Sequence, residues 1–117
     1  MSEKSTFGKM IAAARKDSRR RWSLRELAEK VTKEDGSNVT PQYLNDIEHD
    51  RRVPSDFVIA ELSRALEIDV DTLRLMAGQQ PVDVKDYLQK TPDAADVVAK
   101  AFRKALEAAR KQHKTTG

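Results

Sequence analysis

The sequence predicts an all-α protein, in which a five-helix bundle over residues 1–80 is followed by a two-helix extension over residues 81–117. Apolar residues recur at spacings of three and four, the period expected of helices with one buried side. Alternation of β-branched and polar residues, which would indicate strands, is nearly absent. The four prolines and four glycines fall where these helices should start or stop, which supports the same division.

Five apolar stripes define the helices of the expected bundle. They are Phe7, Met10, Ile11 and Ala14; Leu24, Leu27, Ala28 and Val31; Tyr43, Leu44 and Ile47; Val58, Leu62, Ala65 and Leu66; and Leu73, Met76 and Ala77. Because each stripe lies on one side of its helix, the helices can bury these sides against one another in a common core.

Residues that cap helices sharpen these boundaries. Ser23 and Glu26 have the spacing of a capping box, in which a hydroxyl and a carboxylate each accept from a backbone N–H. Thr40 is a second expected cap, with Pro41 at the first helical position, where no N–H is needed. The remaining boundaries are Pro54-Ser55-Asp56 at the start of the fourth helix and Gly78 after the fifth.

The extension is predicted to hold a short helix near Asp83–Gln89 and a longer one over Asp93–Lys111, which Thr91-Pro92 starts. The longer helix is apolar over a wider arc than a surface helix normally exposes. The residues of this arc are Ala94, Val97, Val98, Ala101, Phe102, Ala105, Leu106 and Ala109. Two explanations are open: one side of this helix covers the bundle, or it contacts a second subunit.

Composition excludes several classes of protein. The chain has no cysteine, so it forms neither disulfides nor thiolate zinc sites, and we expect a cytoplasmic protein. Residues 1–9 lack the apolar core of a signal peptide, and no apolar run approaches the ~20 residues of a membrane span. Neither a Ser/His/Asp set nor a Gly-rich phosphate loop is present, so we expect no enzyme and no cofactor. His49 and His113 have no metal-ligand spacing with a second histidine, so we expect no metal site.

Charge is unevenly distributed along the chain. Residues 1–30 carry nine Lys/Arg and four Asp/Glu, residues 31–80 carry five and ten, and residues 81–117 carry eight and five. This pattern alone gives weak support for a nucleic-acid partner, because highly charged helical proteins often show such blocks. Aromatic residues make up 5% of the chain, too few to suggest a stacking platform for single-stranded RNA.

The segment over residues 22–54 has the organisation of a helix-turn-helix. It contains, in order, a capped helix, a connector, a second short capped helix over Pro41–Glu48 and a basic turn. Leu27 of the first helix can pack against Leu44 and Ile47 of the second. In such a crossing one helix projects into a DNA groove ~12 Å wide, while the other braces it on the backbone.

Five segments, in order and at their mutual distances, carry a resemblance to a known family. They are Ile11–Arg15, Trp22–Lys30, Val39–Glu48, Arg51–Ser55 and Leu62–Ile68. Over roughly Phe7 to Gly78, the sequence resembles the Xre/Cro-type helix-turn-helix domains of phage-repressor-like regulators. The resemblance implies a lambda-repressor-like bundle that binds double-stranded DNA and regulates transcription.

The resemblance makes Pro41–Glu48 the recognition helix. Gln42 should read a base edge, because its amide can pair bidentately with adenine N6 and N7. Tyr43, Asn45 and Asp46 are the next candidates for base reading. Asp46 can accept from cytosine N4, or it can repel other sequences.

The resemblance also implies contacts to the DNA backbone. The candidates are Ser23, Arg25, Thr40, Arg51 and Arg52. Backbone N–H groups at the two helix starts suit phosphates, and the arginines form the basic turn after the recognition helix. Leu24 stands where the family often has a phosphate-contacting glutamine, so that contact passes to Arg25 or is lost. Arg19–Arg21 is more simply a solvated turn, with a phosphate contact as the alternative.

Two further features concern the framework around the recognition helix. Arg15 and Glu48 occupy the family positions of a structural ion pair that links the first and third helices. The connector Thr32–Val39 is longer than the usual tight turn, and it places Glu34 and Asp35 near the expected DNA side. The geometry of DNA approach at this connector is therefore open.

Two functions are consistent with these features. In the first, the protein is a repressor that binds a pseudo-palindromic operator as a homodimer. In the second, it is an antitoxin with the same DNA-binding core, whose segment Val82–Gln112 binds a toxin or another protein partner.

Overall fold

The computed structural model describes residues 5–114, with side chains described through residue 112. The chain divides into two compact units, Met1–Gln80 and Pro81–Gly117. Within the described residues every regular element is a helix, and the one β contact is an isolated antiparallel bridge between Thr32 and Asn38. The predicted all-α fold is thus confirmed.

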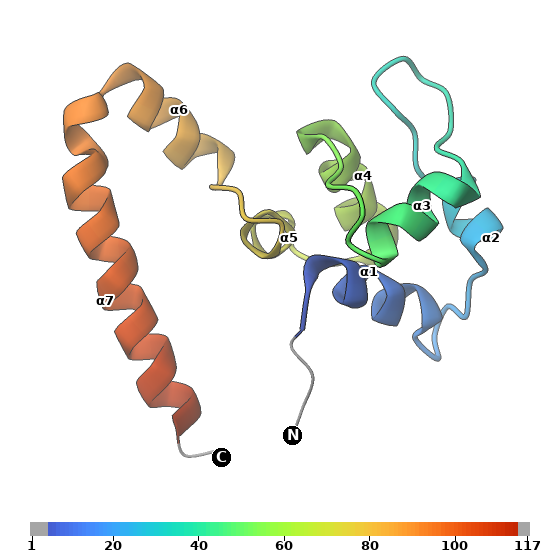
Figure 1. Cartoon of the computed structure of the whole chain (residues 1–117), viewed down its shortest axis with the longest axis horizontal. Coiled ribbons are helices and arrows are strands. Elements are labelled where there is room, and N and C mark those ends of the chain that lie inside the picture. The colour runs from blue at the N-terminus through green and yellow to red at the C-terminus, as the bar shows by residue number, and fades with distance from the viewer. Residues whose placement is uncertain (1–4, 115–117) are drawn as a thin grey trace. The chain divides into compact units, whose positions relative to one another are not determined.

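The first unit is a bundle of five helices (Figure 1). They are α1 (Phe7–Lys16), α2 (Leu24–Ala28), α3 (Pro41–Glu48), α4 (Asp56–Leu66) and α5 (Val70–Met76). Helix α3 packs against both α1 and α2, and α4 packs against α5. The recognition helix predicted from the sequence has the same bounds as α3.

One continuous core holds this bundle together. Its buried members come from all five helices and from both ends of the connector: Phe7, Ile11, Leu27, Ala28, Val31, Val39, Leu44, Ile47, Val58, Ile59, Leu62, Leu66 and Leu73. Val31, which the apolar stripe placed with the second helix, lies beyond the end of α2 but is still buried. Met76, from the fifth stripe, is 37% exposed and lies at the edge of the bundle.

The predicted caps fix the starts of α2 and α3. In the capping box of α2, the Glu26 N–H donates to Ser23 Oγ at 3.1 Å and the Ser23 N–H donates to Glu26 Oε1 at 2.9 Å. At α3, the Tyr43 N–H donates to Thr40 Oγ1 at 3.0 Å, with Pro41 at the first position. These local bonds set where each helix of the helix-turn-helix begins.

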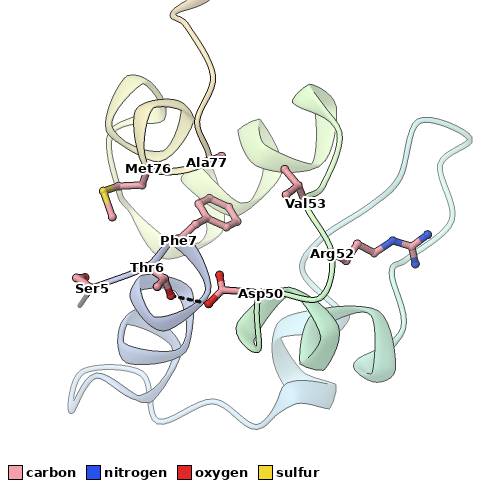
Figure 2. A pocket seen from close by; sticks show the side chains of 8 residues that line it. All are labelled: Ser5, Thr6, Phe7, Asp50, Arg52, Val53, Met76 and Ala77. Atoms are coloured by element: carbon pink, nitrogen blue, oxygen red, sulfur yellow. Dashed lines mark hydrogen bonds between the residues drawn. The ribbon is translucent and has the colours of Figure 1, made fainter. Parts of the chain in front are cut away.

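A close contact between the start of α1 and the end of α3 was not predicted. Asp50, with a positive φ of 59°, accepts from the Gly8 N–H at 2.9 Å. It also accepts from Thr6 Oγ1 at 2.7 Å (Figure 2). A Cβ added to Gly8 would lie 2.5 Å from the Ile47 carbonyl oxygen, so only glycine fits this approach. Asp50 thus caps α1 from the end of α3, and it borders the open hollow drawn in Figure 2.

The second unit holds α6 (Val82–Lys90), the short 3₁₀ helix η1 (Pro92–Ala94) and α7 (Ala95–Lys114). The two predicted helices are therefore present, although the longer one begins with a 3₁₀ turn. No residue between 82 and 112 is buried within this unit. Among the described helices of both units, none is at once long and apolar enough to cross a membrane.

Candidate nucleic-acid interface

The contact between α2 and α3 is made by small and branched apolar side chains. Leu27, Leu44 and Ile47 are fully buried, and Ala28 is 4% exposed at the crossing. A buried alanine lets the two helix backbones approach closely. The crossing expected of a helix-turn-helix is thus present, and it leaves the opposite side of α3 exposed.

The inner side of α3 is fixed to α1 by a buried ion pair. Arg15 Nε lies 2.6 Å from Glu48 Oε2, and Arg15 Nη2 lies 2.9 Å from Glu48 Oε1. Arg15 Nη1 also donates to the Trp22 carbonyl oxygen at 2.8 Å. The hydrogen bonds to Glu48 raise the pKa of Arg15, so this guanidinium stays charged. Both partners are engaged inside the bundle, where they orient α3.

Polar side chains cover the outer side of α3. Gln42 is exposed, and Asn45 and Asp46 are half-buried. Gln42 Nε2 donates to Asp46 Oδ1 at 3.0 Å, which orients the glutamine amide across one turn of the helix. Its second N–H and its carbonyl oxygen retain the donor and acceptor that bidentate pairing with adenine requires.

The Asp46 carboxylate is shared between α3 and the turn that follows it. Arg51 Nε donates to Asp46 Oδ1 at 3.1 Å, and Arg51 Nη2 lies 3.0 Å from the same oxygen. The Arg51 side chain is 53% exposed, and ion pairs at such exposure contribute only about 0–1 kcal/mol. Arg51 can therefore exchange this carboxylate for a phosphate at little cost.

Tyr43 lies at the edge of the same surface, beneath Arg52. The Arg52 guanidinium carbon is 4.8 Å from the centre of the Tyr43 ring, a cation–π distance. Burial and the nearby Glu34 carboxylate raise the pKa of Tyr43 against the opposing effect of Arg52, so the phenol stays neutral. Tyr43 and Arg52 thus form a stacked pair, with the acidic connector beside it.

The capping residues expected to contact phosphates are partly occupied within the protein. The Ser23 N–H is bonded to Glu26, which leaves N–H groups further into α2 for a phosphate. The hydroxyls of Ser23 and Thr40 accept from the helices they cap and can still donate their hydrogens outward. Arg25 is exposed on α2.

The long connector between α2 and α3 is a folded hairpin. Val39 N–H donates to the Val31 carbonyl oxygen at 3.0 Å, and Lys33 N–H donates to the Ser37 carbonyl oxygen at 2.7 Å. Asn38 Nδ2 closes the end of α2 by donating to the carbonyl oxygens of Ala28, Glu29 and Val31, at 3.1–3.2 Å. These bonds close the connector into a hairpin between α2 and α3.

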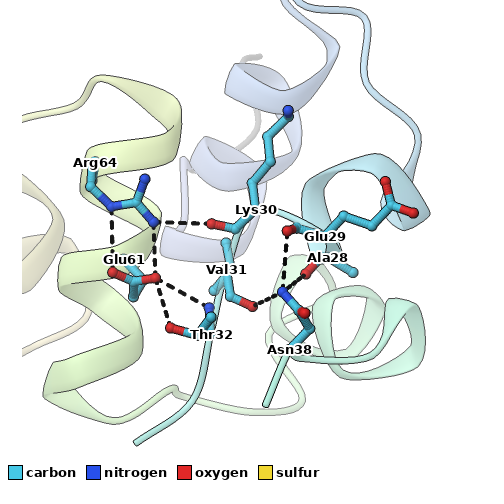
Figure 3. A network of polar contacts seen from close by, with 8 residues as sticks. All are labelled: Ala28, Glu29, Lys30, Val31, Thr32, Asn38, Glu61 and Arg64. Atoms are coloured by element: carbon cyan, nitrogen blue, oxygen red, sulfur yellow. Dashed lines mark hydrogen bonds and ion pairs between the residues drawn. The ribbon is translucent and has the colours of Figure 1, made fainter. Parts of the chain in front are cut away.

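Two side chains of α4 hold this hairpin in place (Figure 3). Glu61 Oε1 accepts from the Thr32 N–H at 3.2 Å and from Thr32 Oγ1 at 3.0 Å. Arg64 Nη2 donates to the Lys30 carbonyl oxygen at 3.1 Å and to Glu61 Oε1 at 2.9 Å. Sequence reasoning missed both residues, since nothing in their local pattern distinguishes them from solvated helix positions.

The basic run before α2 is structural at its centre. Arg20 Nη2 donates to the Leu66 carbonyl oxygen and also lies 3.2 Å from Glu67 Oε2. Its side chain is 6% exposed, beside the Trp22 ring. The interpretation of Arg19–Arg21 as a fully solvated turn is therefore wrong for Arg20, which ties the α1–α2 turn to the end of α4.

The candidates for base reading and for the basic turn thus lie on α3 and directly after it, and the others lie on α2 and at the caps of α2 and α3. A capped helix, a second helix fixed on its inner side and a basic turn define a helix-turn-helix DNA-binding domain. A family model described as helix-turn-helix matches residues 11–73, more than half of the chain. No curated protein and no solved structure matches the chain. The protein belongs to the Xre and lambda-repressor-like helix-turn-helix family and is a DNA-binding transcriptional regulator.

Proposed function

We propose that this regulator is a repressor that binds a pseudo-palindromic operator as a homodimer, with α3 in the major groove of each half-site. The observation that carries the proposal is the polar outer side of α3, held rigid by the buried Arg15–Glu48 pair. A fixed helix is required because base-edge hydrogen bonds tolerate little misplacement. A dimer fits because two copies can read two half-sites about one DNA turn apart.

Base reading is assigned to the outer side of α3. Gln42 pairs with an adenine edge while Asp46 orients its amide. Asn45, one turn away from the helix start, contacts the neighbouring base pair, and Asp46 rejects bases that present an acceptor to it. Tyr43 contributes the edge of its ring to a sugar or thymine methyl.

Backbone binding is assigned to the residues around that surface. They are Ser23, Arg25, Thr40, Arg51 and Arg52. These contacts carry no sequence information, but they set the register of α3 on the duplex and supply most of the salt dependence.

The test is selection of bound duplexes from a random DNA library with the purified full chain. The enriched duplex is then titrated against a scrambled duplex of equal length over a range of salt concentrations. We expect an inverted repeat with half-site centres about 10 base pairs apart, and a large affinity ratio over the scrambled DNA. Absence of any enriched sequence, with binding lost at moderate salt, would refute sequence-specific repression.

The second candidate is an antitoxin, in which Val82–Gln112 binds a toxin. It is supported by the exposed apolar side chains of the second unit, among them Tyr87, Phe102 and Leu106. Coexpression with the product of the adjacent gene tests it. A stable complex that forms with the full chain and is lost on deletion of residues 81–117 would favour the antitoxin. If no complex forms, the repressor remains the better proposal.

A further inference from the structure

Helix α7 carries an apolar side that nothing within its own unit covers. Phe102 and Leu106, one turn apart on this side, are 45% and 50% exposed, and every residue from 100 to 112 is exposed. A helix of this length extends about 30 Å. An apolar surface of this extent on a charged protein indicates an interaction site.

The apolar side of α7 has the spacing of a coiled-coil seam. Residues at alternating steps of three and four are Ala95, Val98, Phe102, Ala105, Ala109 and Gln112. The positions that flank this seam include Ala99, Ala101 and Ala108, so a partner helix can approach closely. Charged residues such as Lys100 and Glu107 lie on the opposite side of the helix.

We propose that this surface binds the same surface of a second copy, with the two α7 helices antiparallel. The proposal names the interface of the homodimer proposed above and rests on that proposal. The seam follows a seven-residue repeat, with Ala95, Phe102 and Ala109 at its first position and Val98, Ala105 and Gln112 at its fourth. In an antiparallel pair, a first position of one helix meets a fourth position of the other. The twofold axis of this dimer passes beside the midpoint between Arg103 and Lys104. Each layer, meaning a pair of seam residues in contact, therefore occurs twice, once on either side of the axis.

Packing favours this register. It places Phe102 against Ala105 of the second copy and Val98 against Ala109 of the second copy, so both apolar layers join a larger side chain to a small one, while Ala95 meets Gln112 at the two ends. A parallel pair would instead place Phe102 against Phe102 and Ala105 against Ala105. The layer at position 102 would then be overfilled and the layers at positions 105 and 109 underfilled, and both faults destabilise a core.

Charge favours the antiparallel direction as well. Asp96 lies in the first turn of α7, where it pairs with Lys100 at 3.2 Å, and Arg110 and Lys111 lie near the other end. An antiparallel pair brings Asp96 of one copy beside the basic end of the other. A parallel pair would bring the two basic ends together, which repel one another.

Sedimentation equilibrium of the full chain tests the interface, with Phe102→Lys as the disrupting variant. Glu107→Gln is the control, because it changes the charge by the same amount on the opposite side of the same helix. The proposed dimer buries two Phe102 side chains, one from each copy. We therefore expect Phe102→Lys to raise the dissociation constant of the dimer roughly 10²- to 10⁴-fold, and Glu107→Gln to change it little. Circular dichroism checks that both variants keep their helix content.

Disulfide trapping tests the direction of the helices in a chain that has no cysteine of its own. An equimolar mixture of the single variants Phe102→Cys and Ala105→Cys should form covalent dimers between the two variants under mild oxidation. Each single variant should form far fewer, because positions 102 and 105 face each other and not themselves. Efficient crosslinking of a single variant would show a parallel pair and overturn the register.

DNA binding separates failure of this inference from failure of the proposed function. Phe102→Lys should bind a duplex carrying one half-site as tightly as the unaltered chain does, and should lose affinity only for the two-site operator. An unaltered chain that stays monomeric at ~100 μM, or a dimer that Phe102→Lys leaves intact, overturns the α7 interface. Loss of half-site binding with the dimer intact would instead count against the DNA-reading assignment.

Discussion

Replacing Glu48 with alanine would leave the Arg15 guanidinium buried without its carboxylate. Two Arg15 nitrogens, 2.6 and 2.9 Å from Glu48 oxygens, would lose their acceptors, and both residues are less than one-tenth exposed. Breaking one side of such a pair typically costs ~3–5 kcal/mol. Because the hydrogen bond from Arg15 to the Trp22 carbonyl oxygen remains, we expect the lower end of this range, about 3 kcal/mol.

The assay is urea unfolding followed by Trp22 fluorescence, together with a thermal melt. A loss of about 3 kcal/mol lowers the melting temperature of a domain of this size by roughly 12–24 °C. Glu29→Ala is the control, because it removes the same group from an exposed position of the same bundle. If Glu48→Ala costs no more than this control, the pair does not fix α3 as we infer. Arg15→Met combined with Glu48→Leu should recover most of the loss, since a buried pair can be replaced by apolar groups.

Four further substitutions test the site and its framework. Gln42→Ala should cost roughly 1–3 kcal/mol on the selected operator and little on scrambled DNA, whereas Gln89→Ala should change neither; equal loss on both DNAs would remove Gln42 from base reading. Arg51→Ala should weaken binding to all sequences and reduce the salt slope, and an unchanged slope would argue against a phosphate contact. Glu34→Gln should strengthen binding to all DNA at low salt and less so at high salt, because it removes a negative charge beside Tyr43; equal affinity at low salt would place the connector away from DNA. Gly8→Ala should lower the free energy of unfolding by about 1–3 kcal/mol in urea melts, since its Cβ would overlap the α3 backbone, and an unchanged melt would show that α1 shifts freely.

The fold could be predicted because it depends on local patterns in the sequence. Apolar spacing located the five helices of the first unit, and caps at Ser23 and Thr40 located the starts of α2 and α3. Apolar spacing and capping residues both involve positions within a single turn or helix, so they can be identified from one sequence alone. The family resemblance then supplied the order in which these helices pack.

The unpredicted parts of the site depend on contacts between residues far apart in the chain. Thr6 and Asp50 are 44 positions apart, Thr32 and Glu61 are 29 apart, and Arg20 reaches Leu66 across 46 positions. Each uses a common polar residue whose local pattern matches that of a solvated surface. Only the packed arrangement of α1, α3 and α4 shows which of these residues meets which, so sequence periodicity alone gives no signal for them.

Asp46 illustrates how the structure changes the meaning of a predicted site residue. From the sequence it is a candidate to contact cytosine or to repel other bases, but its Oδ1 atom accepts from both Gln42 and Arg51. We expect DNA to separate these two partners. A phosphate near the turn would draw Arg51 away, because a charge-assisted bond to phosphate replaces an exposed pair of small net value. Asp46 would then hold Gln42 alone, so backbone contact and the orientation of the base-reading amide would be coupled through one carboxylate.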